Sequence, residues 1–563
     1  MSGLLGDNIT ALRRKTAIFW IPRCQWIALA AISALVLIQL YVLLRTAPDA
    51  GHAMTVHKYN QSAQKGSGGL LNALYKQRPV RESARKKCSD IEVPSSYWTA
   101  TSADTQAFVA IPDAGRMGVD DTVCVRVVVP AQKKGVHMAY TPFPNTPWDS
   151  VLLDMVGQRT GVSVPVRLQP VMDIRNTFRE ESHVYEADVR LRDVDEYRAE
   201  GYIEFRDARW NCEDALEPAD YVPEPLHIPH TLRVEVADPR NASPYRLERH
   251  MELPPCTEPD VEGRWIAADA LPFDAGQIPP PDNHGQVWLP YTCRLRRITY
   301  GEFSRCVQAR YPLMHWFGDS NLRRVLKKLT TRGEWCATSA EQQTRPCICE
   351  DYKEDFTRFN ATHRELVIDF DGRGGRMRTD ENADFVHLPG GETTRIYFHK
   401  WEGLSKKNKP AWHASFKDSV SSRFGLPAVA MVSLTNWDAA FDTRAQYSVE
   451  LERLLGIVAK EYPASTELVI RTGQYFCCRS DFDPPDTRSF SRLRNAYFDQ
   501  YTVAAFQERF GHSHKIHVWD VASLAEHRPW AYRNESTDCN ANHARSELVE
   551  IENQVLFNTM CNV

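Results

Sequence analysis

A serine near the middle of the chain has neighbours that could make it a nucleophile. Ser320 lies in the segment His315-Trp-Phe-Gly-Asp-Ser-Asn-Leu-Arg-Arg324, where a short apolar run leads through Gly-Asp-Ser into a stretch with basic residues. At a strand-to-helix turn, the serine amide and the positive end of the helix could stabilise an oxyanion. Alone, the triplet is weak evidence, because serine is also a common helix cap and aspartate a common turn residue.

A base for this serine is present near the C-terminus. His543 precedes an amphipathic run of helical period, Ala544–Phe557. It could take the hydroxyl proton of a serine nucleophile, provided that an acidic or amide side chain orients its ring. Asp538 and Asn540, a few residues upstream, are the candidates for that role.

Other residues could stabilise charge at the same place. Asn436 follows an apolar run and could donate its side-chain amide to an oxyanion, while Gly372 or Gly374 could supply a backbone N–H. Arg323 and Arg324 could bind an anionic group of a substrate, and the alternative is that they form a solvated basic helix face.

The elements that must position these residues have the rhythm of an α/β domain. Four apolar runs have strand length: Leu313–Phe317, Leu366–Phe370, Ala428–Leu434 and Leu468–Ile470. Helix-compatible stretches follow, such as Arg323–Leu329 and Tyr447–Tyr462. This alternation predicts a mostly parallel sheet with helices over residues 286–563. Sites in such sheets lie at the carboxyl ends of the strands, where Ser320 is expected.

Residues 96–285 have a different pattern. Short segments alternate apolar and polar residues between turn residues: Val123–Val129, Val162–Leu168, Tyr185–Leu191, Tyr202–Phe205 and Thr231–Val236. Period two with intervening turns predicts an antiparallel β-sandwich. Leu271–Gly285, which contains three consecutive prolines, is expected to be a linker or boundary loop.

The N-terminal region predicts a membrane anchor. Residues 26–44 carry no formal charge over nineteen residues, which is enough helix to cross a bilayer. Basic residues are concentrated in the short tail 1–25, so this tail is expected in the cytosol and the rest of the chain in the lumen. Residues 45–95 are polar and rich in Gly, Ser, Lys and Arg, which is typical of a stem.

Composition is consistent with a secretory protein. Of 14 cysteines in 563 residues, all but Cys24 follow the predicted span, and their odd number leaves one free or paired between chains. We expect disulfides rather than a metal site. Four acceptor triplets for N-glycosylation follow the span, at Asn60, Asn241, Asn360 and Asn534. The 68 basic and 72 acidic residues give a net charge of −4, so no nucleic-acid partner is expected.

Taken together, these motifs resemble the PC-esterase branch of the SGNH hydrolases. That branch includes the NXPE (neurexophilin and PC-esterase) proteins and the trichome-birefringence-like polysaccharide O-acetyltransferases of plants. The resemblance covers residues 286–563. It rests on Trp288-Leu-Pro-Tyr-Thr-Cys293 with Cys306, Gly318-Asp-Ser-Asn-Leu-Arg323, Val469-Ile-Arg-Thr-Gly-Gln-Tyr475, and the terminal histidine with its trailing helix and cysteine.

The resemblance implies an SGNH-like α/β/α domain after an immunoglobulin-like sandwich, in a single-pass type II Golgi membrane protein. It further implies serine-dependent O-acetyl transfer to hydroxyls of a glycan or polysaccharide acceptor. No cofactor would be bound, and an acetyl donor such as acetyl-CoA would be a co-substrate. The alternatives are a carbohydrate acetylesterase and a non-catalytic lumenal binding protein with a degenerate hydrolase domain.

One residue departs from the family pattern. The family has Asp-x-x-His, whereas Asn540 stands three residues before His543. Three alternatives follow: Asp538 orients the histidine, Asn540 suffices, or the site is impaired.

Overall fold

The computed structural model describes residues 87–98, 106–130, 149–171, 182–205, 224–229, 233–237, 247–258, 262–331, 365–370, 375–378, 394–405, 412–416, 419–442, 444–475, 492–526, 528 and 546–562. Contacts divide the chain into two units, Met1–Arg81 and Glu82–Val563, and every described residue belongs to the second unit. The predicted membrane segment, the stem up to residue 86 and the four glycosylation triplets lie outside the described residues. Within the described part, no helix has the length and apolar character to cross a membrane.

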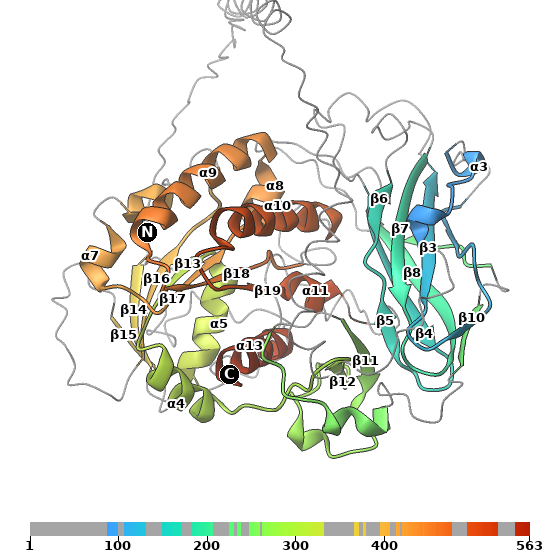
Figure 1. Cartoon of the computed structure of the whole chain (residues 1–563), viewed down its shortest axis with the longest axis horizontal. Coiled ribbons are helices and arrows are strands. Elements are labelled where there is room, and N and C mark those ends of the chain that lie inside the picture. Colours follow the sequence, from blue (N-terminus) through green and yellow to red (C-terminus); the bar gives the residue numbers. More distant parts are fainter. Residues whose placement is uncertain are drawn as a thin grey trace, which may run out of the picture. The chain divides into compact units, whose positions relative to one another are not determined.

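Two β-sheets form the N-terminal half of the second unit (Figure 1). The first has the order β1-β3-β7-β6 and consists of β1 (Phe108–Ala110), β3 (Thr122–Pro130), β7 (Ser182–Arg190) and β6 (Gln169–Val171), all paired antiparallel.

The second sheet is larger. Its order is β12-β11-β5-β4-β8-β10-β2, with β9 beside β8. Its strands are β2 (Arg116–Gly118), β4 (Ser150–Gly157), β5 (Ser163–Pro165), β8 (Glu196–Phe205), β9 (Glu224–Pro225), β10 (Arg233–Ala237), β11 (Gly263–Ala267) and β12 (Gln286–Pro290). All pairs are antiparallel except β10 with β2.

One shared core joins the two sheets. Alternate residues of β3, such as Val123, Val125 and Val127, are fully buried and pack with alternate residues of β4, such as Val151 and Leu153. This is the outcome of period-two patterning, which places every second side chain on the inner face. The antiparallel sheets predicted from the alternating segments are therefore confirmed.

The Pro-rich segment 271–285 connects two strands that pair with each other. β11 and β12 are antiparallel neighbours, with Trp265 opposite Trp288. Ile278, within the segment, is fully buried in the core of the two sheets. The segment is therefore the connection within a β-hairpin of the larger sheet rather than a linker between domains.

A third sheet of seven strands forms the C-terminal half, in the order β15-β14-β16-β13-β17-β18-β19. Its strands are β13 (Leu313–Gly318), β14 (Glu365–Phe370), β15 (Gly375–Arg378), β16 (Thr394–Lys400), β17 (Val429–Ser433), β18 (Glu467–Arg471) and β19 (Ile516–Trp519). Five neighbouring strands are all parallel: β16, β13, β17, β18 and β19. At one edge of the sheet, β14 pairs antiparallel with β16, and β15 pairs antiparallel with β14. The predicted, mostly parallel sheet is confirmed.

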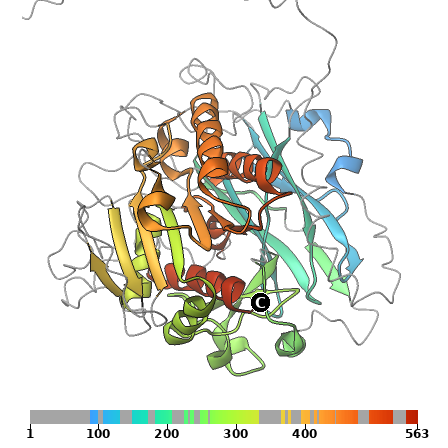
Figure 2. The same cartoon turned by 60° about the vertical axis from the view of Figure 1, so that its left-hand side comes forward.

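Helices cover both faces of this sheet (Figures 1 and 2). One face packs on α4 (Tyr300–Arg310), α5 (Ser320–Thr331) and α13 (Ser546–Cys561), and the other on α9 (Arg444–Glu461) and α10 (Arg492–Phe510). The remaining helical elements are short: η1 (Cys88–Asp90), α3 (Ser95–Trp98), η2 (Leu247–Glu252), η3 (Ala268–Ala270), η4 (Ala275–Gln277), η6 (Trp412–Phe416), α7 (Val420–Phe424), α8 (Asn436–Phe441) and α11 (Val521–Glu526).

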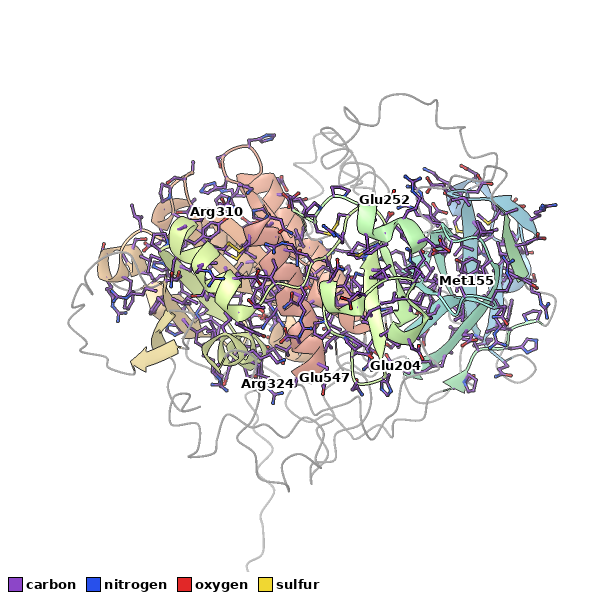
Figure 3. The ribbon with its side chains drawn as sticks, turned by 90° about the horizontal axis from the view of Figure 1, so that it is seen from below. Met155, Glu204, Glu252, Arg310, Arg324 and Glu547 are labelled. Atoms are coloured by element: carbon purple, nitrogen blue, oxygen red, sulfur yellow. A yellow bond between two sulfur atoms is a disulfide. The ribbon has the colours of Figure 1, made fainter. Side chains whose placement is uncertain are left out.

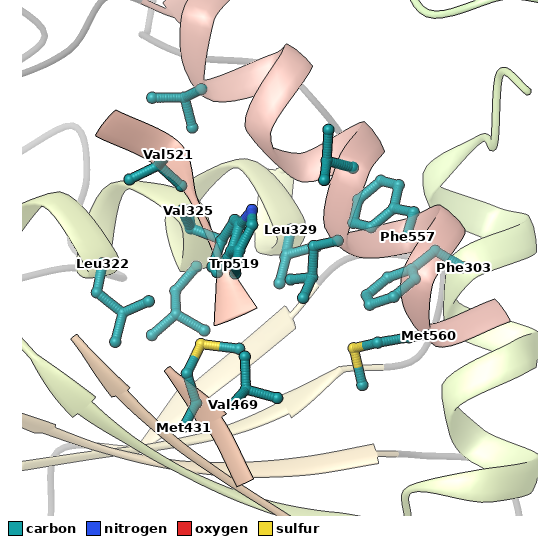
Figure 4. Close-up of a cluster of buried hydrophobic side chains, with 14 of the residues drawn as sticks. Phe303, Leu322, Val325, Leu329, Met431, Val469, Trp519, Val521, Phe557 and Met560 are labelled. Atoms are coloured by element: carbon teal, nitrogen blue, oxygen red, sulfur yellow. The ribbon is translucent and has the colours of Figure 1, made fainter. Parts of the chain in front are cut away.

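The core under α5 and α13 shows why these helices stay in place (Figure 4). Met431 of β17 and Val469 of β18 point into it, whereas their neighbours along each strand enter the opposite core. Phe303 of α4 stacks on Phe557 of α13, with ring centroids 4.0 Å apart. The last helix of the chain is thus an integral part of the domain.

Three disulfides join described residues: Cys88–Cys124, Cys256–Cys293 and Cys306–Cys561. The third links α4 to the end of α13 across 255 residues of sequence. Disulfides persist in oxidising surroundings, so they indicate a secretory or extracellular compartment.

Candidate functional site

The carboxyl ends of four parallel strands meet at one edge of the seven-stranded sheet. β13 ends at Gly318, β17 at Ser433, β18 at Arg471 and β19 at Trp519. Ser433 is the register partner of Arg471, which is the partner of Trp519. We call this the carboxyl edge.

Ser320 lies at the carboxyl edge, as the first residue of α5, and is half-buried. The Asp319 carboxylate accepts hydrogen bonds from the backbone N–H groups of Asn321 at 2.9 Å and Leu322 at 3.4 Å. Asp319 therefore caps the helix, so a capping role does not explain why a serine stands at position 320. A hydroxyl at this position lies at the positive end of the helix dipole.

Gly318 is needed for the strand ends to approach each other. A Cβ at this position would lie 2.7 Å from the Cβ of Ser433 and 2.9 Å from a methyl group of Leu322. Any larger residue would therefore separate β13 from β17 directly before the Ser320 turn.

Arg323 and Arg324 are each only 1 % exposed. The expectation of a solvated basic helix face is wrong for both. Their use in substrate binding stays a prediction.

Asn436 lies at the start of α8 and follows β17, which is the parallel neighbour of β13, the strand before Ser320. Its Nδ2 donates to the carbonyl of Gln474 at 2.9 Å, and its Oδ1 accepts from the N–H of Gln474 at 2.6 Å. A carboxamide has two donor hydrogens, so among the described residues these two bonds leave one N–H of Asn436 for an oxyanion. The side chain is oriented by the turn after β18.

Thr435, directly before Asn436, has a φ of +82°. A β-branched residue rarely adopts positive φ, and such strain is retained only where surrounding contacts enforce it. Here the contact is Asp499 of α10, whose Oδ1 accepts from the Thr435 hydroxyl at 2.7 Å and from the N–H of Gly473 at 2.8 Å. Asp499 thereby joins the turns that follow β17 and β18.

A buried ion pair fixes α13 to the same edge. The Arg471 guanidinium donates to Glu552 at 3.1 Å, and both side chains are fully buried. Arg471 also donates to Gln474 at 2.7 Å and to the Ser433 hydroxyl at 3.2 Å. Burial raises the pKa of the Glu552 carboxyl, while Arg471 and Gln474 oppose that rise. Glu552 thus ties the last helix to the ends of β17 and β18.

The carboxyl group of Asp438, two residues after Asn436, is also buried and hydrogen-bonded. Asp438 of α8 accepts from the N–H of Leu404 and from both the N–H and hydroxyl of Ser405, so it holds the segment after β16. Burial raises the pKa of Asp438 to about 7, against the lowering effect of these hydrogen bonds.

The larger antiparallel sheet also reaches this edge. The hydroxyl of Tyr475, after β18, donates to Glu204 of β8, whose other carboxylate oxygen accepts from Ser150 at 2.7 Å. Tyr475 packs with Leu152 and Tyr202 of the same sheet. Figure 3 shows Glu204 on the sandwich side of the molecule and Arg324 on the α/β side. The sandwich therefore contacts the turn that orients Asn436.

The expected base and its partners, His543, Asp538 and Asn540, lie outside the described residues, which resume at Ser546 with α13. Gly372 and Gly374 are also outside them. β14 runs antiparallel to β16, so its last residue, Phe370, pairs with Thr394 at the amino ends of the parallel strands. The premise that this segment starts at the carboxyl edge is wrong, and we do not include Gly372 in the site.

Sequence reasoning missed Asp499, Arg471 and Glu552. Other buried polar residues lie on the same helices, such as Asn495 on α10 and Asn553 on α13, and no local motif distinguishes the three. The sequence did contain a signal for Arg471, because it follows three apolar residues at the end of a predicted strand. Glu552 lies in the predicted amphipathic run, within the stretch Ile551–Met560, which is buried throughout.

No metal site emerges from the described residues. The one group there with metal-ligand spacing is Cys88, Cys124 and Glu186, and the two cysteines form a disulfide.

Comparisons with protein-family models and with curated proteins found no match to this chain.

Proposed function

We propose that this protein is a serine-dependent O-acyltransferase of the PC-esterase type, which acetylates hydroxyl groups of a glycan or polysaccharide. The observation that carries the proposal is that Ser320 starts α5 after β13, while Asn436 starts α8 after β17, the parallel neighbour of β13. A nucleophile beside helix N–H groups and an oriented carboxamide is the arrangement that acyl transfer requires.

The proposed reaction has two steps. The Ser320 hydroxyl attacks the acyl carbonyl of the donor, His543 accepts its proton, and the donor leaves with that proton. A sugar hydroxyl then attacks the acyl-serine, its proton passes to His543 and on to Ser320, and the acetylated sugar departs. In both tetrahedral intermediates, the Ser320 amide and the Asn436 side chain donate to the oxyanion.

The proposed setting is the Golgi membrane, with residues 26–44 as the single type II anchor and the enzyme domain in the lumen. The disulfides support an oxidising compartment. The immunoglobulin-like character of the sandwich and the SGNH-like character of the α/β domain belong to the same proposal. Biosynthetic placement favours transfer over hydrolysis, with acetylesterase as the alternative outcome.

Mass spectrometry of O-acetylated glycans tests the proposal. Glycans from cells that express the intact protein are compared with glycans from cells that express Ser320→Ala. More acetyl groups with the wild-type protein support a transferase, and fewer support an esterase. Equal acetyl content with both, at matched protein levels, would contradict enzymatic activity on glycans.

A non-catalytic binding protein is a second candidate, and Asn540 in place of the family aspartate favours it. An amide cannot stabilise an imidazolium as a carboxylate does. If the protein is a non-catalytic binding protein, Ser320 is unreactive already in the wild type. Asp538→Ala would then have no effect on reactivity at Ser320.

A further inference from the structure

Two buried acceptor oxygens lie one turn apart on the same face of α10. Asn495 is 1 % exposed and Asp499 is 6 % exposed. The Oδ1 of Asn495 and the Oδ2 of Asp499 have no hydrogen-bond partner within the part of the chain that the structure describes. A buried polar atom without a partner costs free energy, and an ionised carboxylate oxygen in this state costs most.

The other atoms of the two side chains are already in use. The Nδ2 of Asn495 donates to the carbonyl of Gln474 at 3.3 Å, so this bond fixes which way the amide faces. The Oδ1 of Asp499 accepts from Thr435 and Gly473. Reversing the amide would lose the bond to Gln474 and place an acceptor against a carbonyl.

A single proton would satisfy both oxygens. Side chains four residues apart on a helix are neighbours, and a protonated carboxyl can donate where an ionised one can only accept. We infer that Asp499 is a neutral carboxylic acid in the folded protein, that its Oδ2–H donates to Asn495, and that it is a positioning residue for Asn436. The last part of this inference rests on the proposed function.

The electrostatic surroundings agree with a neutral carboxyl. Burial, and to a smaller extent the Asp520 carboxylate, raise the pKa of Asp499 well above its ordinary value. The Gly473 N–H, the Thr435 hydroxyl and the Arg471 guanidinium lower it, but by less. Tyr447 of α9, itself buried, also interacts with this carboxyl, and burial raises its pKa so that it stays neutral.

The link to Asn436 runs through two turns. Asp499 accepts from Thr435, whose positive φ sets the direction in which Asn436 leaves the strand. It also accepts from Gly473, the residue before Gln474, which holds both polar atoms of the Asn436 amide. Loss of the carboxyl would therefore release both turns at once.

Two substitutions separate the parts of this inference. Asp499→Asn keeps the shape and the acceptor oxygen and replaces the O–H by an N–H, so it imitates the neutral acid. Asp499→Ala removes every contact. Glu508→Ala, at an exposed position of the same helix, is the matched control.

Infrared difference spectroscopy of the intact protein at neutral pH reads the protonation state. The carbonyl stretch of a protonated carboxyl should appear in wild type minus Asp499→Asn. Asp499→Asn should also melt at or above the wild-type temperature, whereas Asp499→Ala should melt lower. An absent carbonyl band, or an Asp499→Asn variant as unstable as Asp499→Ala, would overturn the neutral carboxyl.

Labelling of Ser320 by an alkyl fluorophosphonate reads the positioning role. In folded Asp499→Ala, the maximal labelling rate should fall by about 10²-fold, as after loss of one oxyanion donor, with little change in the concentration for half-maximal rate. Asp499→Asn should recover most of that rate, and Glu508→Ala should match the wild type. A wild-type rate in Asp499→Ala would overturn the positioning role. If wild type is not labelled, the proposed function fails and the positioning role with it, while the infrared and melting results still decide the protonation state.

Discussion

Removal of one partner from the Arg471–Glu552 pair should loosen α13 strongly. The pair is fully buried on both sides, and its N–O distance is 3.1 Å. Replacing Glu552 by leucine leaves an uncompensated buried cation, which costs about 3–5 kcal/mol. The chain has more than one core, so one global free energy of unfolding would not isolate this effect.

Hydrogen exchange of the α13 amides measures the effect locally. A loss of about 3–5 kcal/mol corresponds to about 10²–10⁴-fold faster exchange through the open state. The double variant Arg471→Met/Glu552→Leu should recover much of the loss, because an apolar pair of similar volume needs no desolvation of charge. Arg249→Ala, which removes an exposed ion pair with Glu252, should cost less than about 1 kcal/mol.

A change of less than tenfold in the exchange of α13 in Glu552→Leu would show that the pair does not hold this helix. A double variant that loses as much stability as the two single variants combined would show that the two charges do not act as a pair.

Three further predictions follow from the same edge and the helices behind it. A Cβ at Gly473 would lie 2.4 Å from the hydroxyl oxygen of Thr435, so Gly473→Ala should lower stability by about 1–3 kcal/mol in a thermal melt and slow fluorophosphonate labelling. Gly456→Ala, in an uncrowded part of α9, should be neutral or stabilising in the same melt. Replacing Cys306 and Cys561 by serine opens a loop of 255 residues and should cost up to about 5 kcal/mol by chemical denaturation, and an unchanged midpoint would show that α13 docks without the bond. The pKa of Asp438 is raised from 3.8 to about 7, so the folded state holds this proton more tightly, and its contribution to stability should be full below pH 3.8 and lost as the pH rises through about 7. The difference in melting temperature between pH 5 and pH 8 should be smaller in Asp438→Asn than in wild type, because the buried carboxyl of Asp499 contributes to it in both proteins.

The parts of the fold that the sequence predicts are those with strong periodicity. Val123–Val129 alternates and forms a sandwich strand, and Leu313–Phe317 is an apolar run that forms a parallel strand. The placement of Ser320 at a strand-to-helix turn followed from such runs and from the Gly-Asp-Ser triplet. The hydrophobic pattern therefore predicted which segments form strands or helices, and it placed Ser320 in the candidate site.

The direction of a strand within its sheet and the burial of charged side chains could not be predicted in the same way. An apolar run such as Leu366–Phe370 is the same whether its strand is parallel or antiparallel, so the expectation for Gly372 had no support. Arg323 and Arg324 read as solvated because most arginines are exposed, yet both are buried. Asp499 acts through contacts with residues more than twenty positions away, which no local pattern records.

The proposed activity requires Ser320 to be a reactive nucleophile in the folded protein. Peptide mapping by mass spectrometry after treatment of the intact protein with an alkyl fluorophosphonate tests this directly. We expect one adduct, on Ser320, that forms far more slowly in His543→Ala and is absent from Ser320→Ala. A folded wild-type protein without an adduct, or with its adduct on another residue, would contradict it.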